Sequence, residues 1–374
     1  MNLETLNSRK RNDLWSYLQS TGKKILMYGM GNGADKILSI CERYGIEVSD
    51  FFASDGFVRG HLFHGKRVLS YSEACEKYGR DNMIVLLSFA SSLPDVLANI
   101  YRIAEECELY APDVPVCGEN LFNYEFFKEN EGKICQTERL LADEKSVEVF
   151  TDVINYKLSG DVRWLQNGHS DFSEVYRLLD AEKFERIADL GAYNGDTLRE
   201  IAPFAPNLKE AVAFEPDRRN HKKLESYAES EERFKITAIK AAAWKGKETL
   251  LFDGSGNRNS TLISAGIEVN RPPKTVEVAA ESLDHILGGE GIDYIKFDVE
   301  GAEKEAIEGS LETIRKYRPA LMISLYHRSE DVFELPLMIH ERFPDYKFYI
   351  RRREYIPAWD TVLVAVSDQA IKND

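Results

Sequence analysis

Apolar runs of strand length alternate with stretches of helical spacing in two separate parts of the chain. In the first part, strands are predicted over residues 23–30, 48–54 and 83–90, and helices over 34–45, 70–79 and 94–106. The strand runs are almost continuously apolar, which is typical of parallel strands that helices cover on both faces. This pattern predicts a small Rossmann-like α/β domain over residues 1–118.

The strand signals stop between residues 119 and 183. Long amphipathic stretches such as ERLLADEKSVEVFTDVINYKL occupy this region. Apolar residues recur there at helical spacing, so the segment is predicted to be a mainly helical connector.

The alternation resumes over residues 184–374 and predicts a second, larger α/β domain. The strands are expected at 186–190, 210–216, 236–244, 293–300 and 320–327, with a further strand pair at 247–252 and 275–281. Helices are expected at 196–204, 218–230, 282–289, 302–317 and 330–343. A short polar segment separates two last strands, at 346–352 and 360–366, which favours an antiparallel hairpin on the sheet edge.

Composition narrows the class of protein. The 374 residues are 43% hydrophobic, enough for two cores, and carry a formal net charge of −15. No long basic tract offsets this charge, so a nucleic acid is not expected as the partner. No apolar run of membrane-spanning length or signal-peptide pattern is seen, and the five cysteines lack paired spacing, so a cytoplasmic enzyme without membrane insertion is expected.

A glycine turn, DLGAYNGDT, follows the first strand of the second domain at 189–197. In open α/β sheets the first such turn lines the ligand crevice, and Gly191 and Gly195 would let a ligand approach the backbone. Glu215 ends the next strand and is placed to accept both hydroxyls of a ribose. The turn is therefore predicted to hold a nucleoside, the alternative being a turn that only tightens a strand-to-helix corner.

The acids around the turn indicate which nucleoside it holds. The spacing is G-x-x-x-G, and Asp189 and Asp196 flank it, whereas a dinucleotide fingerprint has G-x-G-x-x-G or a final Ala. Two acids would repel a diphosphate. They suit S-adenosylmethionine, which carries a sulfonium and an ammonium cation.

A second group of charged residues ends the strand YIKFDVE. Strand alternation places Lys296, Asp298 and Glu300 on one side, at or near the carboxyl edge of the sheet. The following strand ends in Tyr326 and His327. Charges in a buried strand are costly unless they are paired or used, so the group is a candidate site. The alternative is an ion pair of Lys296 with one of these acids, together with Glu303 as a helix-start acid.

Together these segments resemble the FkbM family of S-adenosylmethionine-dependent methyltransferases. The likeness runs from about Arg186 to Val366, through DLGAYNGDT, FEPD, AAAW, IKFDVEGAE, SLYHRSEDVFELP and WDTVL. It implies a seven-stranded class I methyltransferase sheet and methylation of hydroxyl groups, often of sugars in natural products and surface polysaccharides. The candidate cofactor residues are Asp189, Gly191, Asn194, Gly195, Thr197, Glu215 and Asp298.

Two hypotheses describe how an acceptor hydroxyl loses its proton. In the first, His327 or Asp298 is the general base. In the second, Asp298, Glu300 and His327 bind a divalent metal that lowers the hydroxyl's pKa. The first is preferred. Hard cations favour oxygen ligands, and here the ligands would come from just one strand end together with a single imidazole.

The acceptor is expected to be a small molecule or a nucleotide-linked sugar. Arg258, Asn259 and Ser260, in the polar loop 253–261, are candidate acceptor contacts, the alternative being a flexible hairpin tip. Glu300 and Tyr326 are further candidates. In the connector, Trp164 and His169 are polar and aromatic enough to touch a ligand. Homo-oligomerisation is left open.

The first domain has a glycine turn of its own, GMGNGADK. Gly29, Gly31 and Ala34 fit G-x-G-x-x-A, with Gly33 in the same turn, and predict a second nucleotide site. Asp50 or Asp55 would be its ribose acceptor. The alternative is a domain without a ligand that serves assembly. Two other functions stay open: a nucleotide-dependent oxidoreductase or epimerase, and a non-catalytic sugar-nucleotide-binding protein.

Overall fold

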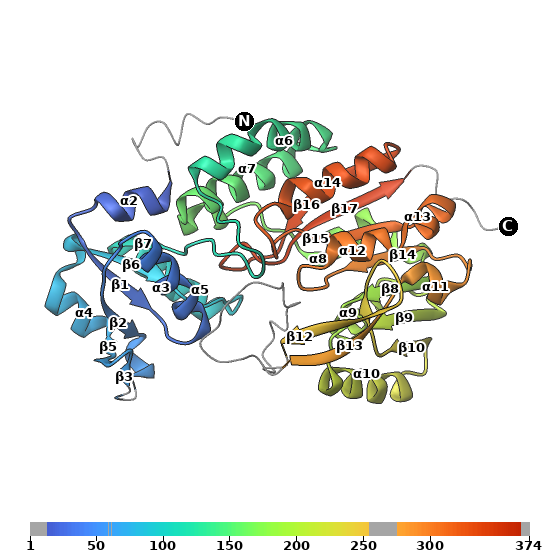
Figure 1. The fold of residues 1–374 in the computed structure, drawn as a ribbon, viewed down its shortest axis with the longest axis horizontal. Coiled ribbons are helices and arrows are strands. Elements are labelled where there is room, and N and C mark those ends of the chain that lie inside the picture. The colour runs from blue at the N-terminus through green and yellow to red at the C-terminus, as the bar shows by residue number, and fades with distance from the viewer. Residues whose placement is uncertain (1–12, 59, 61, 254–274, 368–374) are drawn as a thin grey trace.

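The computed structural model describes residues 13–58, 60, 62–253 and 275–367. Two mainly parallel sheets lie toward opposite ends of the long axis, and the helices α6 and α7 lie between them along one side (Figure 1). Both predicted α/β regions are present, so the predicted fold class is confirmed.

The first sheet has five parallel strands in the order β5-β2-β1-β6-β7. Its strands are β1 (Lys24–Tyr28), β2 (Val48–Ala53), β5 (Leu69–Ser70), β6 (Met83–Leu87) and β7 (Glu108–Tyr110). Its helices are α2 (Leu14–Ser20), α3 (Asn32–Arg43), α4 (Tyr71–Tyr78) and α5 (Pro94–Glu106), with short 3₁₀ turns η1 (Asp55–Phe57) and η2 (Arg80–Asn82). A small hairpin, β3 (Leu62–Phe63) and β4 (Lys66–Arg67), follows β2. Sequence reasoning missed β5 and β7 because two or three residues are too few to form an apolar run.

The second sheet has seven strands in the order β10-β9-β8-β14-β15-β17-β16. They are β8 (Arg186–Leu190), β9 (Glu210–Phe214), β10 (Lys235–Ile239), β14 (Tyr294–Phe297), β15 (Ala320–Ser324), β16 (Tyr346–Arg352) and β17 (Thr361–Ser367). β17 runs antiparallel to both neighbours and lies between β15 and β16. The predicted hairpin at the sheet edge is therefore present, with β16 as the edge strand.

A three-stranded sheet stands apart from these two. It pairs β11 (Ala242–Ala243), β13 (Thr275–Glu281) and β12 (Glu248–Asp253). The single strand predicted over 236–244 is wrong, because β10 and β11 belong to different sheets. The Ala241 N–H bonds the carbonyl of Ile239 at 3.0 Å, so the chain turns between them.

The helices of the second region are α9 (Asp196–Ile201), α10 (Arg218–Ser230), α11 (Leu283–Leu287), α12 (Glu303–Glu308), α13 (Leu311–Tyr317) and α14 (Asp331–Arg342). The one helix predicted over 302–317 is divided into α12 and α13. The break falls at Gly309, where a Cβ atom would lie 2.0 Å from the carbonyl oxygen of Trp244. Close approach of that backbone therefore requires glycine at this position.

The connector is helical, as predicted, with α6 (Tyr124–Leu140), α7 (Glu144–Ser159), η3 (Val162–Leu165), α8 (Phe172–Leu178) and η4 (Ala181–Lys183). Its helices pack on both faces of the second sheet near β17. Leu363 and Ala365 share a core cluster with α7, whereas Val362 and Val364 share another with α8. Alternation along β17 thus places α7 and α8 on opposite faces.

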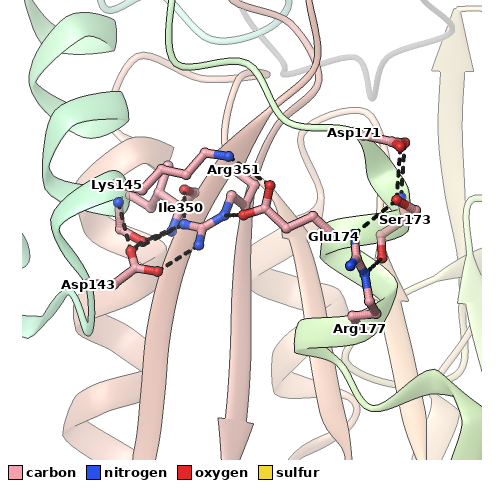
Figure 2. A network of polar contacts seen from close by, with 9 residues as sticks. Asp143, Lys145, Asp171, Ser173, Glu174, Arg177, Ile350 and Arg351 are labelled. Carbon is pink, nitrogen blue, oxygen red and sulfur yellow. Dashed lines mark hydrogen bonds and ion pairs between the residues drawn. The ribbon is translucent and has the colours of Figure 1, made fainter.

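An ion-pair network fixes the connector to the edge strand (Figure 2). Arg351 of β16 contacts Asp143, which caps α7, with Nη2 2.6 Å from the carboxylate, and Glu174 of α8, with Nε 2.9 Å from it. Lys145 also pairs with Glu174, at 2.7 Å. Arg351 is 2% exposed, so its contacts give it a structural role.

One continuous cluster of buried apolar side chains joins the regions that the sequence separated. It includes Leu26 and Val85 of the first sheet, Phe150 of the connector, and Ile323 and Leu363 of the second sheet. The proposed boundaries 1–118, 119–183 and 184–374 stay predictions about the chain, since this core crosses all three segments. In the described part of the chain, no helix combines the length and the apolar character that crossing a bilayer requires.

Candidate active site

The predicted site residues meet at the carboxyl edge of the second sheet, where the strand order reverses between β8 and β14. Asp189 pairs in register with Lys296, and β14 in turn pairs with β15. The chain therefore carries Asp298 past the end of β14 and His327 past the end of β15 on the same edge. This is the position where open α/β sheets bind ligands.

Lys296 lies between two carboxylates. Its Nζ is 3.0 Å from Oδ2 of Asp298 and 3.7 Å from Oδ1 of Asp189. The Lys296–Asp298 ion pair considered from the sequence is present. Asp189 is 1% exposed, and neither of its carboxylate oxygens has a hydrogen-bond partner. Burial raises the pKa of Asp189 to about 6.

The other oxygen of Asp298 accepts two hydrogen bonds. Ser324 Oγ donates to Oδ1 at 2.8 Å, and the Tyr326 hydroxyl donates at 3.1 Å. Burial acts to raise the pKa of Asp298, but the charges of Lys296 and His327, with the bonds from Lys296 and Ser324, lower it to about 2. Sequence reasoning missed Ser324, because serine at a strand end carries no distinctive signal.

His327 is fully buried among three carboxylates. Its Nδ1 is 2.8 Å from Oε1 of Glu303, and its Nε2 is 3.6 Å from Oε2 of Glu300 and 3.7 Å from Oδ1 of Asp298. Burial opposes protonation, but the charge of Glu303 and its hydrogen bond, then the charges of Glu300 and Asp298, raise the pKa of His327 to about 10. A general base works best with a pKa near the working pH, and the role of His327 or Asp298 as general base stays a prediction.

Glu300 reaches the site by a different route from the one predicted. β14 ends at Phe297, so strand alternation stops before Glu300, and its backbone has φ +53°. Its side chain is 40% exposed, and partial burial, with the charges of Asp298 and Glu303, raises the pKa of Glu300 to about 7 despite the opposing charge of His327.

Glu303 does more than occupy the start of a helix, because its carboxylate also contacts His327. It is 1% exposed and accepts the Val299 N–H at 2.9 Å through the same oxygen that contacts His327. Its other oxygen has no hydrogen-bond partner. The sequence placed it at the helix start but could not show that its partner lies 24 residues further on.

Glu215 lies beside the glycine turn. The carbonyl of Phe214, one residue earlier, accepts the N–H groups of Gly191 and Ala192 at 3.1 and 2.8 Å. Glu215 is 7% exposed, and its carboxylate accepts the Asp217 N–H at 2.8 Å. Burial raises the pKa of Glu215 to about 7.

The packing of the protein itself requires glycine at both positions of the turn. A Cβ at Gly191 would lie 1.9 Å from the carbonyl oxygen of Asp298, and one at Gly195 would lie 2.5 Å from the Tyr227 ring. Both also have positive φ, +93° and +85°. Protein atoms thus exclude side chains at both positions, and the approach of a ligand to this backbone stays a prediction.

The remaining turn residues are held by local bonds. Asn194 accepts hydrogen bonds from Arg199 through both its carbonyl groups, at 3.0 and 3.3 Å. Thr197 donates its N–H to the carboxylate of Asp196 at 2.9 Å. Cofactor contacts of Asn194 and Thr197 stay predictions.

The glycine turn of the first sheet follows β1, at the point where that sheet's strand order reverses. Gly29 and Gly31 have positive φ, and a Cβ at Gly33 would lie 2.1 Å from the carbonyl oxygen of Ser88. Asp50 is wrong as a ribose acceptor, because it lies inside β2 and pairs with Lys77 at 2.7 Å. Asp55 does follow β2, but its carboxylate accepts bonds from Ser72. A nucleotide at this turn stays a prediction.

Segments from the first region contact the edge of the second sheet. Ser91, which follows β6, exchanges two backbone hydrogen bonds with Ile356, at 2.8 and 3.0 Å. The Cys117 N–H donates to the carbonyl of His327 at 3.1 Å. Lys36 of α3 donates to the carbonyl of Val116 at 3.0 Å. The chain that leaves the first sheet therefore packs directly against the candidate site.

Several residues predicted to contact a ligand are not among the residues that the structure brings together at this site. Arg258, Asn259 and Ser260 lie outside the described residues. Trp164 is half-buried against apolar side chains and His169 is exposed, so their ligand contacts stay predictions. Two surface hollows lie elsewhere, one beside Leu141, Asp143 and Val147, the other beside Arg199, Lys222 and Tyr227.

Comparison with known proteins now identifies the second region. Residues 189–357 match the family model of the methyltransferase FkbM domain. The chain carries an FkbM methyltransferase domain. That domain spans the glycine turn, Glu215, and His327 with the three carboxylates around it, Asp298, Glu300 and Glu303. No curated protein matches the chain.

Solved structures are similar to different extents. A crystal structure of methyltransferase FkbM from Methylobacillus flagellatus KT is similar over 96% of this chain and 93% of its own, with 19% identity and a TM-score of 0.70. An rRNA methylase from Streptococcus thermophilus is similar over 52% of this chain and 95% of its own, with 15% identity and a TM-score of 0.33. Aeropyrum pernix fibrillarin with natively bound S-adenosyl-L-methionine is similar over 52% and 74%, with 13% identity and a TM-score of 0.32. The first likeness shows that the fold, including the first sheet and connector, is shared with an FkbM methyltransferase.

Proposed function

We propose that this FkbM methyltransferase uses S-adenosylmethionine to methylate a hydroxyl group of a sugar or a sugar-containing small molecule. The observation that supports the cofactor best is Asp189, a buried carboxylate without a hydrogen-bond partner beside the glycine turn. Buried polar atoms almost always have partners, and although Lys296 Nζ lies 3.7 Å from Oδ1 of Asp189, neither oxygen is hydrogen-bonded, so a further cationic partner fits this carboxylate. S-adenosylmethionine has such cations and no phosphate.

The residues of the turn would hold this cofactor at its two ends. Glu215 would accept the ribose hydroxyls, and Asp189 would compensate the positive charge of the amino acid portion. When bound, S-adenosylmethionine supplies a methyl group on a sulfonium sulfur, which keeps the electrons of the broken S–C bond as the acceptor oxygen takes the methyl group. The protein's contribution is to align acceptor and donor.

Aromatic side chains beside the cluster support a sugar as acceptor. The Tyr326 ring is stacked near Trp359, with ring centroids 6.4 Å apart, and Tyr355 lies 5.9 Å from Trp359. All three residues are half-buried. Flat aromatic surfaces pack against the C–H faces of sugar rings, while Glu300 and the Tyr326 hydroxyl can bond sugar hydroxyls.

Calorimetry with the full-length protein tests the cofactor. S-adenosylmethionine and S-adenosylhomocysteine should bind with micromolar affinity, on the order of −8 kcal/mol. Glu215→Ala should weaken this binding at least tenfold, since it removes the ribose acceptor. Glu229→Ala, at an exposed position on α10, is the matched control and should bind as the wild type does.

Equal affinity in Glu215→Ala and the wild type would contradict the assigned ribose contact. The acceptor is then sought by methyl transfer from labelled donor to a panel of free and nucleotide-linked sugars. Transfer to a protein or nucleic acid but to no sugar would overturn the acceptor class.

A further inference from the structure

We propose that His327, Asp298 and Glu300 bind a divalent metal cation of the manganese or magnesium type, and that Glu303 positions His327 for this purpose. The site is inferred from side-chain geometry alone. Only its role in deprotonating an acceptor rests on the proposed function.

The distances within the cluster are slightly longer than those between neighbouring ligands around an ion. Nε2 of His327 is 3.6 Å from Oε2 of Glu300 and 3.7 Å from Oδ1 of Asp298, too far for good hydrogen bonds. Ligand atoms about 2.0–2.2 Å from a cation are roughly 3.0–3.6 Å from one another. Asp298 and His327 also belong to a group with Glu303 in which one candidate ligand atom from each residue lies within 4.8 Å of the others, so the pair common to both groups is already close together. A small shift would therefore close the cluster around one ion.

The imidazole has one nitrogen committed and one available. Nδ1 contacts Glu303, whose carboxylate is itself held by the Val299 N–H. Nε2 is fully buried, has no hydrogen-bond partner and is directed at the two other carboxylates. A carboxylate that bonds one nitrogen of a histidine while the other nitrogen ligates a metal is a recurring arrangement in metal sites.

Charge and backbone conformation support the same ligand set. Three carboxylates surround a single imidazole, and Lys296 compensates only the far oxygen of Asp298. Glu300 holds its carboxylate near His327 with a positive φ, a conformation that costs energy and that functional sites often retain. A cation would balance the surplus of negative charge.

The first region of the chain holds the ligand-bearing loops in place. A Cβ at Gly301, next to Glu300, would lie 2.0 Å from Sγ of Cys117, and the Cys117 N–H bonds the His327 carbonyl. Arg328 also donates to the carbonyl of Gly301 at 2.9 Å. The loops that carry Glu300 and His327 are thus fixed to each other and to the segment around Cys117.

In the proposed reaction, this cation would bind the acceptor hydroxyl and lower its pKa. The hydroxyl proton passes to water, the oxygen forms its new bond to the methyl carbon, and the electrons of the S–C bond stay on sulfur.

Titration of chelator-treated, full-length protein with Mn²⁺ tests the site without any methyl donor. Electron paramagnetic resonance should show one bound Mn²⁺ per chain, with a nitrogen coupling from one imidazole. Glu300→Gln should weaken binding at least tenfold because it removes a ligand. Glu303→Gln should weaken it roughly 10- to 100-fold because it removes the group that orients His327. Glu312→Gln, exposed on α13, is the control and should bind as the wild type does.

Three outcomes overturn the proposal: no bound Mn²⁺ in the wild type, a bound ion without nitrogen coupling, or equal binding in Glu300→Gln and the wild type. Circular dichroism of each variant shows whether it is folded, and because Glu300 is half-exposed, its variant is the one least expected to disturb the core. Calorimetry with S-adenosylmethionine on the same wild-type preparation separates the two proposals. Cofactor binding without Mn²⁺ binding would contradict the metal site alone. Mn²⁺ binding without cofactor binding would contradict the proposed cofactor alone.

Discussion

Acidic side chains at the edge of the second sheet differ in protonation because their neighbours differ. Asp298 has a lysine, a serine and a tyrosine as partners, and its pKa is lowered to about 2. Glu215 has a backbone N–H as its bonded partner, and burial raises its pKa to about 7. Glu215 is therefore the acid whose ionisation changes closest to pH 7 in the cofactor half of the site, and Asp189, with a pKa of about 6, follows at lower pH.

This difference predicts a pH dependence of cofactor binding. The carboxylate of Glu215 accepts ribose hydroxyls better than the protonated acid does, so affinity for S-adenosylmethionine should fall as pH falls through about 7. The decrease should be at most about tenfold per pH unit. Calorimetry between pH 8 and pH 6.5 measures it, and Glu215→Gln should bind more weakly with a flatter profile, since only Asp189, with a pKa of about 6, still titrates near this range. A wild-type profile as flat as that of Glu215→Gln would contradict the assignment.

Among the elements, the glycine turn and strand β14 depend on each other. The turn has to place Gly191 against the carbonyl of Asp298, so the residue that contacts Lys296 also shapes the turn that faces the cofactor. A substitution in the glycine turn should therefore alter the conformation at the end of β14, and a substitution there should alter the turn.

Gly191→Ala should destabilise the protein by at least about 2 kcal/mol, from its positive φ and from the contact with backbone that cannot move aside. Gly246→Ala is the control, since a Cβ there meets no atom within 4 Å and its φ is not positive. It should change stability by less than about 0.5 kcal/mol. Urea unfolding compares the two variants with the wild type, and similar stabilities for both would show that the turn can relax.

The contact between connector and sheet is also an element-scale feature. Asp143 caps α7, accepting the Ser146 N–H at 2.8 Å, and pairs with Arg351 (Figure 2). Burial opposes ionisation of Asp143, but Arg351 and the Ser146 bonds lower its pKa from 3.8 to about 2. Because the folded pKa is lower than the unfolded one, the ionised carboxylate stabilises the folded state above pH 3.8, and this contribution is lost as pH falls toward 2.

Asp143→Ala should therefore cost about 1–3 kcal/mol at pH 7, through the lost cap and the unpaired Arg351. The difference from wild type should be smaller at pH 3. Urea unfolding at both pH values measures it, with Glu229→Ala as an exposed control that should match the wild type. A difference that stays the same at pH 3 would contradict the assignment.

At the scale of the whole molecule, the two sheets share one core through the connector. Leu26 of β1 and Leu363 of β17 belong to the same buried cluster, and Ser91 and Ile356 join the two regions by backbone hydrogen bonds. This shared core suits a site in which segments from both regions hold the loops at the carboxyl edge of the second sheet.

The chain should accordingly unfold in a single cooperative transition, although it is long enough for two domains. Differential scanning calorimetry should give a calorimetric enthalpy close to the van't Hoff enthalpy for the whole chain. Two separated transitions would mean that the shared core contributes little coupling between the sheets.

Much of the fold could be predicted from the sequence because its strands are apolar runs with sharp ends. The runs at β1, β8, β14 and β15 located both sheets, and the resemblance to FkbM proteins implied the seven-stranded sheet, which the structure has. The division of residues 236–244 and of 302–317 could not be predicted, since each depends on backbone contacts with distant segments.

What the sequence by itself determined is which residues stand at the carboxyl ends of the strands, because a strand's length and the turn after it are local properties. Asp189, Glu215, Asp298 and His327 were located in this way. What only the tertiary structure decided is which atoms of these residues meet. Glu303 bonds His327 across 24 positions, and Cys117 reaches His327 across 210. Protonation and ligand geometry follow from those distances and from burial, which arise only when the sheets pack.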